Sequence, residues 1–406
     1  MSKRIIVIGG GTFEPIRNHL SLAAPAFGKT AREIHNNLGG ELFLTKMCHS
    51  QSTMITNKDV EDLIDDLIKD ETVGTIVMNA ALCDYKALPI DENENGWHGK
   101  RLKTSEGGLT LSLTPTDKLI GKIRKARPDI FLVGFKTTTY ESSENQFLIA
   151  LKMMKKSKCN LVLANDTVTR NNMIITPEET IYGETTNRED VINELCDMIR
   201  MRQNLTYHRG EFFKCENRSF EDAPVNFKSV MKFLINNGGY IENNGNGFTP
   251  GHFCYRNRET TDGRSSFVSS QRLVNHNDVI KNGMTYVHVK ESDNTFSYYG
   301  DKKASVGARS QYLLLKENSE YDFIIHTHNP LKEGSVIPTT PQKPFQCGSI
   351  ECGVNTLNNL GTFQGGAIKA VYLEKHGINL MFTKWCTADT VIEFLKDNIE
   401  LGIKIK

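Results

Sequence analysis

Three histidines in the second half of the chain have the residue type and spacing of a metal site. His326 and His328 follow the apolar run Phe323-Ile-Ile325, which is typical of a buried strand. Side chains two residues apart on a strand share one face, so the two imidazoles should point the same way. His376 ends a second apolar stretch, 371–376, and could add a third nitrogen for a divalent metal, zinc first among them. A His-x-His pair at a strand end can also be ordinary surface.

The composition limits the class of protein. A chain of 406 residues has room for about two domains. Its net charge of +1 gives no reason to expect nucleic acid or an acidic membrane surface as a partner, so small molecules are the expected substrates. Nine cysteines without a Cys-x-x-Cys pair favour free thiols and a cytoplasmic protein. The first apolar run, 5–8, is too short for a signal peptide or a membrane span.

The first half alternates between short apolar runs and segments with helical spacing. This alternation predicts an α/β domain over 1–205 with a doubly wound, mainly parallel, Rossmann-like sheet, which binds ligands beyond the carboxyl ends of its strands. The glycine turn 9–11 follows the first of these strands. The expected strands are 4–8, 41–45, 75–79, 130–135 and 160–164, and the expected helices are 29–38, 60–69, 118–125, 145–156 and 189–201.

Two common nucleotide motifs are excluded in this half. A Gly-x-Gly-x-x-Gly fingerprint beginning at Gly9 would need glycine where the chain has Glu14. A phosphate loop ending at Gly28-Lys29-Thr30 would need glycine at Ala23. Any nucleotide must therefore be bound by a different set of residues.

Six short motifs instead occur in an order that resembles the phosphopantothenoylcysteine synthetase family, over nearly all of 4–200. The resemblance implies a ligase that activates a carboxylate with CTP or ATP and Mg²⁺, after which an amine displaces the nucleotide. The motifs are Gly10-Gly-Thr-Phe-Glu-Pro15, Phe27-Gly-Lys29, Ala80-Ala-Leu-Cys-Asp-Tyr85, Lys100-Arg-Leu-Lys103, Val133-Gly-Phe-Lys-Thr-Thr138 and Leu163-Ala-Asn-Asp166.

This resemblance also implies roles for individual residues. Lys100 and Arg101 would neutralise the triphosphate during catalysis, although a solvated surface role is the alternative for each. The family usually carries an asparagine at the position of Ala24, which indicates a different acid substrate or a changed reaction. The expected nucleotide-binding residues are Gly10, Gly11, Thr12, Asp84, Lys103, Phe135, Asn165 and Asp166.

The second half has a different order of elements. A polar linker is expected at 206–222, followed by a domain over 223–406. Its expected helices are 226–236, 305–316 and 388–398, and its expected antiparallel strands are 252–256, 267–269, 285–290 and 295–299. With the His-x-His strand and Lys375-His-Gly377, this order resembles the α/β fold of the class II aldolase and adducin family, which has a central antiparallel sheet.

In that family a metal held by residues matching His326, His328 and His376 is implied, and Ser269, Ser270 and Ser305 would bind a substrate phosphate. The chain departs from the family pattern at two positions. His252 replaces an asparagine, and Gly307 stands where a glutamate normally moves protons. Glycine cannot take a proton. Glu351 is a candidate for that catalytic role or an ordinary surface residue, and Glu374 is a candidate outer partner of the metal.

Two hypotheses of different class remain. The first is a bifunctional enzyme, a nucleotide-dependent carboxylate–amine ligase fused to a divalent-metal-dependent lyase that acts on a phosphorylated small molecule. The second is a degenerate binding protein that captures a nucleotide or a phosphorylated metabolite. Ala24 and Gly307 favour the second hypothesis, because both departures fall on catalytic positions. Both families build sites at subunit contacts, so a homodimer or tetramer is implied by resemblance.

Overall fold

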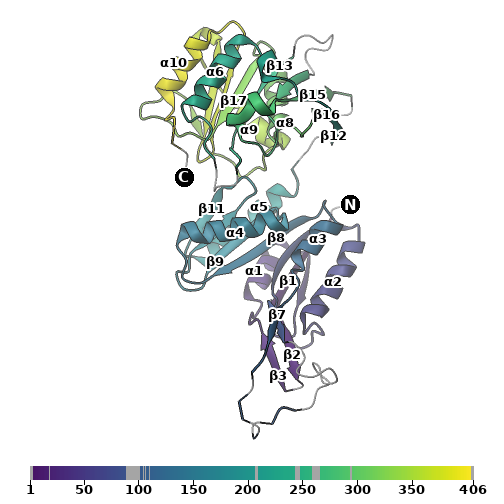
Figure 1. The fold of residues 1–406 in the computed structure, drawn as a ribbon. Coiled ribbons are helices and arrows are strands. Elements are labelled where there is room, and N and C mark those ends of the chain that lie inside the picture. Colours follow the sequence, from purple (N-terminus) through teal and green to yellow (C-terminus); the bar gives the residue numbers. More distant parts are fainter. Residues whose placement is uncertain are drawn as a thin grey trace. The chain divides into compact units, whose positions relative to one another are not determined.

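A computed structural model describes residues 3–17, 19–87, 101–103, 105, 107–108, 110–205, 209–242, 247–257, 266–292 and 295–403. The chain forms two compact units, Met1–Gln203 and Asn204–Lys406. Figure 1 labels their helices and strands and colours the ribbon by residue number. Among the described residues, no helix is long and apolar enough to cross a membrane.

The first unit contains a seven-stranded sheet in the order β11-β10-β9-β8-β5-β1-β4. Its five strands from β9 to β4 are parallel, and β10 and β11 are antiparallel additions at one edge. The mainly parallel sheet expected from the sequence is thereby confirmed. The strands are β1 (Arg4–Gly11), β4 (Glu41–Leu44), β5 (Val73–Ala81), β8 (Phe131–Thr138), β9 (Leu161–Asp166), β10 (Asn172–Ile175) and β11 (Ile181–Thr185).

Helices cover both faces of this sheet because its strands are apolar on both sides. Ile6 and Ile8 pack in one core with Ile64 of α2, whereas Val7 packs in the other core with Ile34 of α1. This alternation follows from the two-residue period of a strand. Two small hairpins, not expected from the sequence, are β2 (Phe13–Arg17) with β3 (Leu20–Ala23) and β6 (Tyr85–Ala87) with β7 (Leu113–Pro115). The helices are α1 (Lys29–Leu38), α2 (Asn57–Lys69), α3 (Ile120–Ala126), α4 (Ser143–Ser157) and α5 (Arg188–Arg202).

The second unit contains a ten-stranded sheet, in the order β12-β16-β15-β14-β13-β17-β21-β20-β18, with β19 also paired to β20. All neighbours are antiparallel except β12 with β16 and β18 with β20, so the expected antiparallel sheet is confirmed. Its strands are β12 (Arg209–Lys214), β13 (His252–Arg256), β14 (Ser266–Ser269), β15 (Thr285–Lys290), β16 (Thr295–Gly300), β17 (Phe323–Thr327), β18 (Thr339–Thr340), β19 (Gly361–Phe363), β20 (Ile368–Leu373) and β21 (Gly377–Phe382).

The segment expected as a linker, 206–222, differs from that expectation. Its residues 209–214 form β12, which pairs in parallel with β16, and Phe220 is fully buried in the core of the second unit. An edge strand pairs on one side only and can carry charged residues on its free side. Its sequence therefore lacks the apolar period that identifies central strands.

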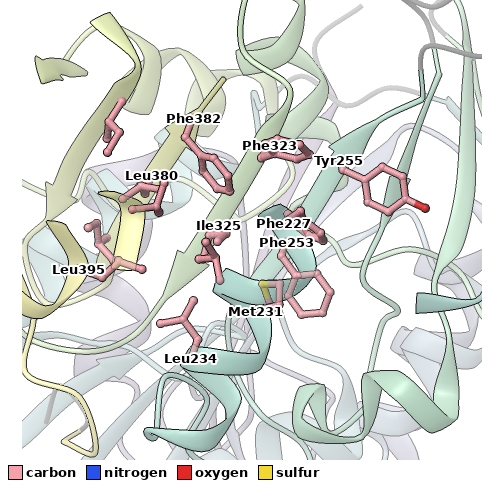
Figure 2. Close-up of a cluster of buried hydrophobic side chains, with 14 of the residues drawn as sticks. Phe227, Met231, Leu234, Phe253, Tyr255, Phe323, Ile325, Leu380, Phe382 and Leu395 are labelled. Carbon is pink, nitrogen blue, oxygen red and sulfur yellow. The ribbon is translucent and has the colours of Figure 1, made fainter. Parts of the chain in front are cut away.

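Helices also cover both faces of the second sheet. On one face, α6 (Val225–Asn236) and α10 (Ala388–Asn398) contribute Phe227, Met231, Leu234 and Leu395, which pack on strand residues such as Phe253 (Figure 2). The opposite core contains residues of α8 (Ala308–Glu317), and α8 packs against α9 (Ile350–Leu357). A short helix, α7 (Val279–Asn282), precedes β15. Each fully buried aromatic side chain in such a core stabilises the fold by about 1.5–3 kcal/mol.

Candidate functional site

Three histidines meet at the end of β17 in the second unit. One ligand nitrogen from each of His326, His328 and His376 lies within 4.8 Å of the other two. Their ring centroids are 4.9, 4.9 and 4.8 Å apart. His326 and His376 are buried, and His328 is partly exposed. The structure therefore brings together the three residues that the sequence singled out.

The approach of β21 to β17 positions the third histidine. His326 is paired in register with Asn379 of β21, and β21 begins at Gly377, directly after His376. A Cβ atom at Gly377 would lie 2.0 Å from the carbonyl oxygen of Thr327 and 3.0 Å from the Cα of His328. Gly377 also has a φ of +135°, which favours glycine. Only glycine allows this close contact, which carries His376 to the other two imidazoles.

The protonation of His326 suits metal binding. Its Nδ1 lies 2.8 Å from the carbonyl oxygen of Ile378, so Nδ1 carries the proton and Nε2 presents a lone pair. Burial, and then the neighbouring imidazoles of His252, His328 and His376, hold the pKa of His326 well below its usual value. The ring is therefore neutral, which ligation requires.

The donor set of the three rings fits a divalent metal. A small hollow lined by Gly239, Ile241, Pro250, His328 and Asn329 includes one of the three histidines. Three imidazoles with open positions are a donor set that suits Zn²⁺ and similar divalent metals.

A fourth histidine, His252, lies beside the other three. It is paired across the sheet with His326, and the two ring centroids are 4.7 Å apart. A Cβ atom at Gly307 would lie 2.2 Å from His252 Cδ2 and 2.3 Å from His252 Nε2. The imidazole therefore fills the space in front of position 307. The sequence marks both residues as unusual, but their contact is visible only in the structure.

The three serines expected to bind phosphate are not equivalent. Ser269 and Ser270 are buried. The hydroxyl of Ser269 donates to Gln311 Oε1 at 3.0 Å, and that of Ser270 accepts from the amide of Phe253 at 3.2 Å. Ser305 is partly exposed and accepts from the amide of Gly307 at 3.4 Å. The hydroxyl proton of Ser269 is thus used inside the protein, and phosphate binding by Ser270 and Ser305 stays a prediction.

The two glutamates considered for proton transfer and metal support lie in different kinds of element. Glu351 is in the first turn of α9 rather than on a loop, and its carboxylate is not in the group of ligand atoms formed by the three histidines. Glu374 is exposed in the turn between β20 and β21, and its role as an outer partner of the metal stays a prediction.

In the first unit, the glycine turn is more enclosed than expected. β1 continues to Gly11, and Gly10, Gly11 and Thr12 are buried. The amide of Gly11 donates to Ala26 at 2.8 Å and that of Thr12 to Ala81 at 3.1 Å. These N–H groups are therefore not free for the phosphate contact that the sequence suggested. They fix the turn at the end of β1.

Two residues that the sequence analysis missed join the ends of β1 and β5. Asn57 Oδ1 accepts from Thr12 Oγ1 at 2.7 Å, and its Nδ2 donates to the carbonyl of Cys83 at 2.8 Å. Lys118 forms an ion pair with the exposed carboxylate of Asp84. Asn57 begins a helix and Lys118 precedes one, so neither lies in a strand-end motif that would have marked it.

Two of the remaining predicted residues of the first unit lie at the same edge of the sheet. Phe135 and Asn165 are partly buried near the ends of β8 and β9. Arg101 and Lys103 are exposed. Ala24, the unusual residue, donates its amide to Thr12 at 3.0 Å and so borders the glycine turn. Lys100 lies outside the described residues.

Asp166, at the end of β9, organises the loops around it. Burial opposes the charged form, but bonds from Glu141, Thr169, Val168 and Thr138 outweigh it and hold the pKa of the Asp166 carboxyl well below its usual value. The amide of Tyr140 is a fifth donor, at 3.1 Å. Since all five donors belong to the protein, Asp166 shapes the rim of the site rather than offering a free carboxylate to a ligand.

We expect Asp166→Asn to lower the melting temperature at pH 7, because an amide cannot accept all five bonds. A depressed pKa stabilises the fold above the unfolded value of about 3.9, and this stabilisation is lost as the pH falls through the folded value. The gap between wild type and variant should therefore shrink below pH 4 in thermal unfolding. Asp197→Asn is the control, since Asp197 is exposed and paired only within its helix. An unchanged gap would contradict this account.

The geometry defines the first unit as a doubly wound α/β domain with its candidate site beyond the strand ends. Residues 1–195 match the family model of the DNA/pantothenate metabolism flavoprotein C-terminal domain. A curated relative is the coenzyme A biosynthesis bifunctional protein CoaBC of Thermococcus kodakarensis, 28% identical over 173 residues, which cover 40% of this chain and 41% of that protein. The match thus spans less than half of that relative's length.

Solved structures resemble each half of the chain. The DNA/pantothenate metabolism flavoprotein of Streptococcus pneumoniae is 22% identical, with a TM-score of 0.42, covering 49% of this chain and 99% of that one. A sugar-phosphate aldolase of Thermotoga maritima is 16% identical, with a TM-score of 0.30, covering 42% of this chain and 92% of that one.

Proposed function

We propose that the first unit is a nucleotide-dependent carboxylate–amine ligase of the phosphopantothenate–cysteine type. The observation that carries this proposal is the family match over residues 1–195, supported by the order of the six motifs. CTP or ATP with Mg²⁺ would activate the carboxylate. Because alanine replaces the usual asparagine at position 24, the acid substrate is proposed to differ from phosphopantothenate.

The test is formation of nucleoside monophosphate and pyrophosphate from CTP or ATP in the presence of paired acids and amines. We expect a carboxylate alone to release pyrophosphate from one nucleotide in a single turnover, as the acyl-nucleotide forms. Release of the nucleoside monophosphate and continued turnover should require an amine as well. Phosphopantothenate with cysteine is the first pair, followed by other small carboxylic acids. No cleavage across such a panel would contradict the ligase proposal.

We expect Arg101→Ala to raise the KM for the nucleotide about tenfold, because a charge-assisted hydrogen bond to phosphate is worth about 1.5–3 kcal/mol. Arg101 is exposed, so its removal takes no side chain from a core. Steady-state kinetics of the variant provide the measurement. Lys152→Ala, which removes an exposed cation from α4, is the control. Equal KM values for wild type and Arg101→Ala would exclude this contact.

For the second unit we propose a divalent-metal-dependent lyase of the aldolase type. The three imidazoles within 4.8 Å of one another support this proposal. His326, His328 and His376 would hold the metal, which would act as a Lewis acid on a carbonyl or alkoxide. Ser305 keeps a partly exposed hydroxyl that could bind the phosphate of a small substrate.

Metal analysis tests this second proposal directly. We expect purified protein to retain about one equivalent of a divalent metal per chain and to recover it after chelation and dialysis against Zn²⁺, Co²⁺ or Mn²⁺. Failure to bind any of them would contradict it. A homodimer or tetramer and a cytoplasmic location stay predictions, of which light scattering tests the first and fractionation of cells the second.

A further inference from the structure

His252 and Gly307 share one space beside the three histidines. His252 and Cys254 lie on the same face of β13 by their spacing, and Cys254 packs in one core with Ala308 and Tyr312 of α8. This face carries His252 to Gly307, which precedes α8. The 2.3 Å between His252 Nε2 and a Cβ at position 307 shows that the ring replaces any side chain there. An imidazole therefore occupies the space where the class II aldolase family, which this unit resembles, usually has the carboxylate of a glutamate.

A chain of hydrogen bonds orients this imidazole. Ser269 donates to Gln311 Oε1 at 3.0 Å, which leaves Gln311 Nε2 to donate to His252 Nδ1 at 2.6 Å. Because Nδ1 accepts, the single proton of the neutral ring is on Nε2. His252 Nε2 thus presents an N–H donor, and the residue is partly exposed.

The candidate ligand atoms of the metal site supply no negative charge to offset a divalent ion. Among the residues that the structure describes, the candidate group of metal-ligand atoms at the site comes from three histidines and contains no carboxylate. The amino terminus of α8, with Gly307 as its N-cap, adds partial positive charge. A divalent ion held by neutral rings in such a place keeps its full charge. An anionic ligand is then favoured over a neutral one.

We infer that His252 is a positioning residue whose Nε2–H donates to an anionic oxygen ligand of the metal site, in the place of the missing carboxylate at position 307. This inference rests on the proposed metal function. The ligand class is a carboxylate or phosphate anion. Ser269 and Gln311 support the site by holding His252, which gives Ser269 a use other than phosphate binding.

The test uses full-length protein loaded with Co²⁺, whose visible absorption reports the surroundings of the ion. Oxalate, inorganic phosphate and neutral glycerol are titrated separately. We expect oxalate or phosphate to change the spectrum at concentrations where glycerol does not. His252→Asn, which restores the residue usual in the resembling family, should weaken anion binding about tenfold or more while Co²⁺ content stays the same. His288→Asn, on β15 of the same sheet, is the control.

The outcomes distinguish the proposed metal function of the second unit from the inference about His252. If wild type binds no Co²⁺, both the proposed metal function and this inference are overturned. If Co²⁺ binds but His252→Asn takes up anions as wild type does, only the inference is overturned. Loss of Co²⁺ from His252→Asn would make His252 a ligand and also overturn it. A response to oxalate alone or to phosphate alone supports the inference and identifies the anion.

A second measurement tests the shared space without any metal. Gly307→Ala should lower the melting temperature in the wild-type background, because the new Cβ collides with the imidazole. The same change should be tolerated when His252 is already asparagine. An equal loss in both backgrounds would show that the imidazole does not occupy the space in front of position 307, and would overturn the inference.

Discussion

His326→Ala is expected to lower the metal affinity of the second unit by more than about 100-fold, since even an outer partner of a ligand costs about 10–100-fold when removed. The ring centroid of His326 lies 4.9 Å from those of both His328 and His376. Its loss leaves two donors for an ion that takes three or four protein ligands. Metal content after dialysis against a buffered ion is the measurement.

His288→Ala is the matched control for this variant. His288 is also a histidine of the same sheet, but its Nδ1 is hydrogen-bonded to the hydroxyl of Ser266 at 3.1 Å. It does not belong to the group of His326, His328 and His376. His288→Ala should keep the metal, whereas His328→Ala and His376→Ala should lose it as His326→Ala does. If all four variants carried the metal of the wild type, the ion would have to be bound somewhere else.

Gly377→Ala is expected to destabilise the second unit by about 3 kcal/mol, from backbone strain and overpacking together. The new Cβ would lie 2.0 Å from the carbonyl oxygen of Thr327. β21 could then meet β17 only after shifting, and His376 would move away from its partners. Urea unfolding measures the change in the free energy of unfolding, and we expect weaker metal binding in the same variant.

Gly334→Ala is the control that separates the effect of backbone strain from the effect of a steric clash. Gly334 also has a positive φ, +78°, but a Cβ there would meet no atom within 4 Å. This control should lower the free energy of unfolding by only about 1 kcal/mol, because it adds backbone strain without a steric clash. It should leave metal binding unchanged. Equal losses for the two variants would mean that the contact with Thr327 does not hold the histidines together.

Much of the fold could be predicted from local sequence. The period of apolar residues located α1, β13, β15 and α10 at their observed bounds. The sequence-based prediction missed short elements and edge strands, such as β12 and the hairpin of β2 and β3. Pairing with a distant strand, rather than an apolar pattern of their own, holds these elements, and a single sequence does not display that pairing.

In the candidate sites, too, some features could be predicted from local sequence and others could not. The three histidines were predictable because strand spacing and a glycine turn restrict where their rings can point. The contact of His252 with Gly307, and of Asn57 with Thr12, could not be predicted because each joins segments at least 45 residues apart. Glu351 was selected because a loop was expected between the two histidine strands, but it lies in α9.

The tight fit of His252 against Gly307 also limits how the second unit can be redesigned. A side chain placed at position 307 would have to share the volume of the imidazole, because even its Cβ would lie 2.2 Å from His252 Cδ2. A carboxylate can therefore be engineered at position 307 only together with a smaller residue at position 252.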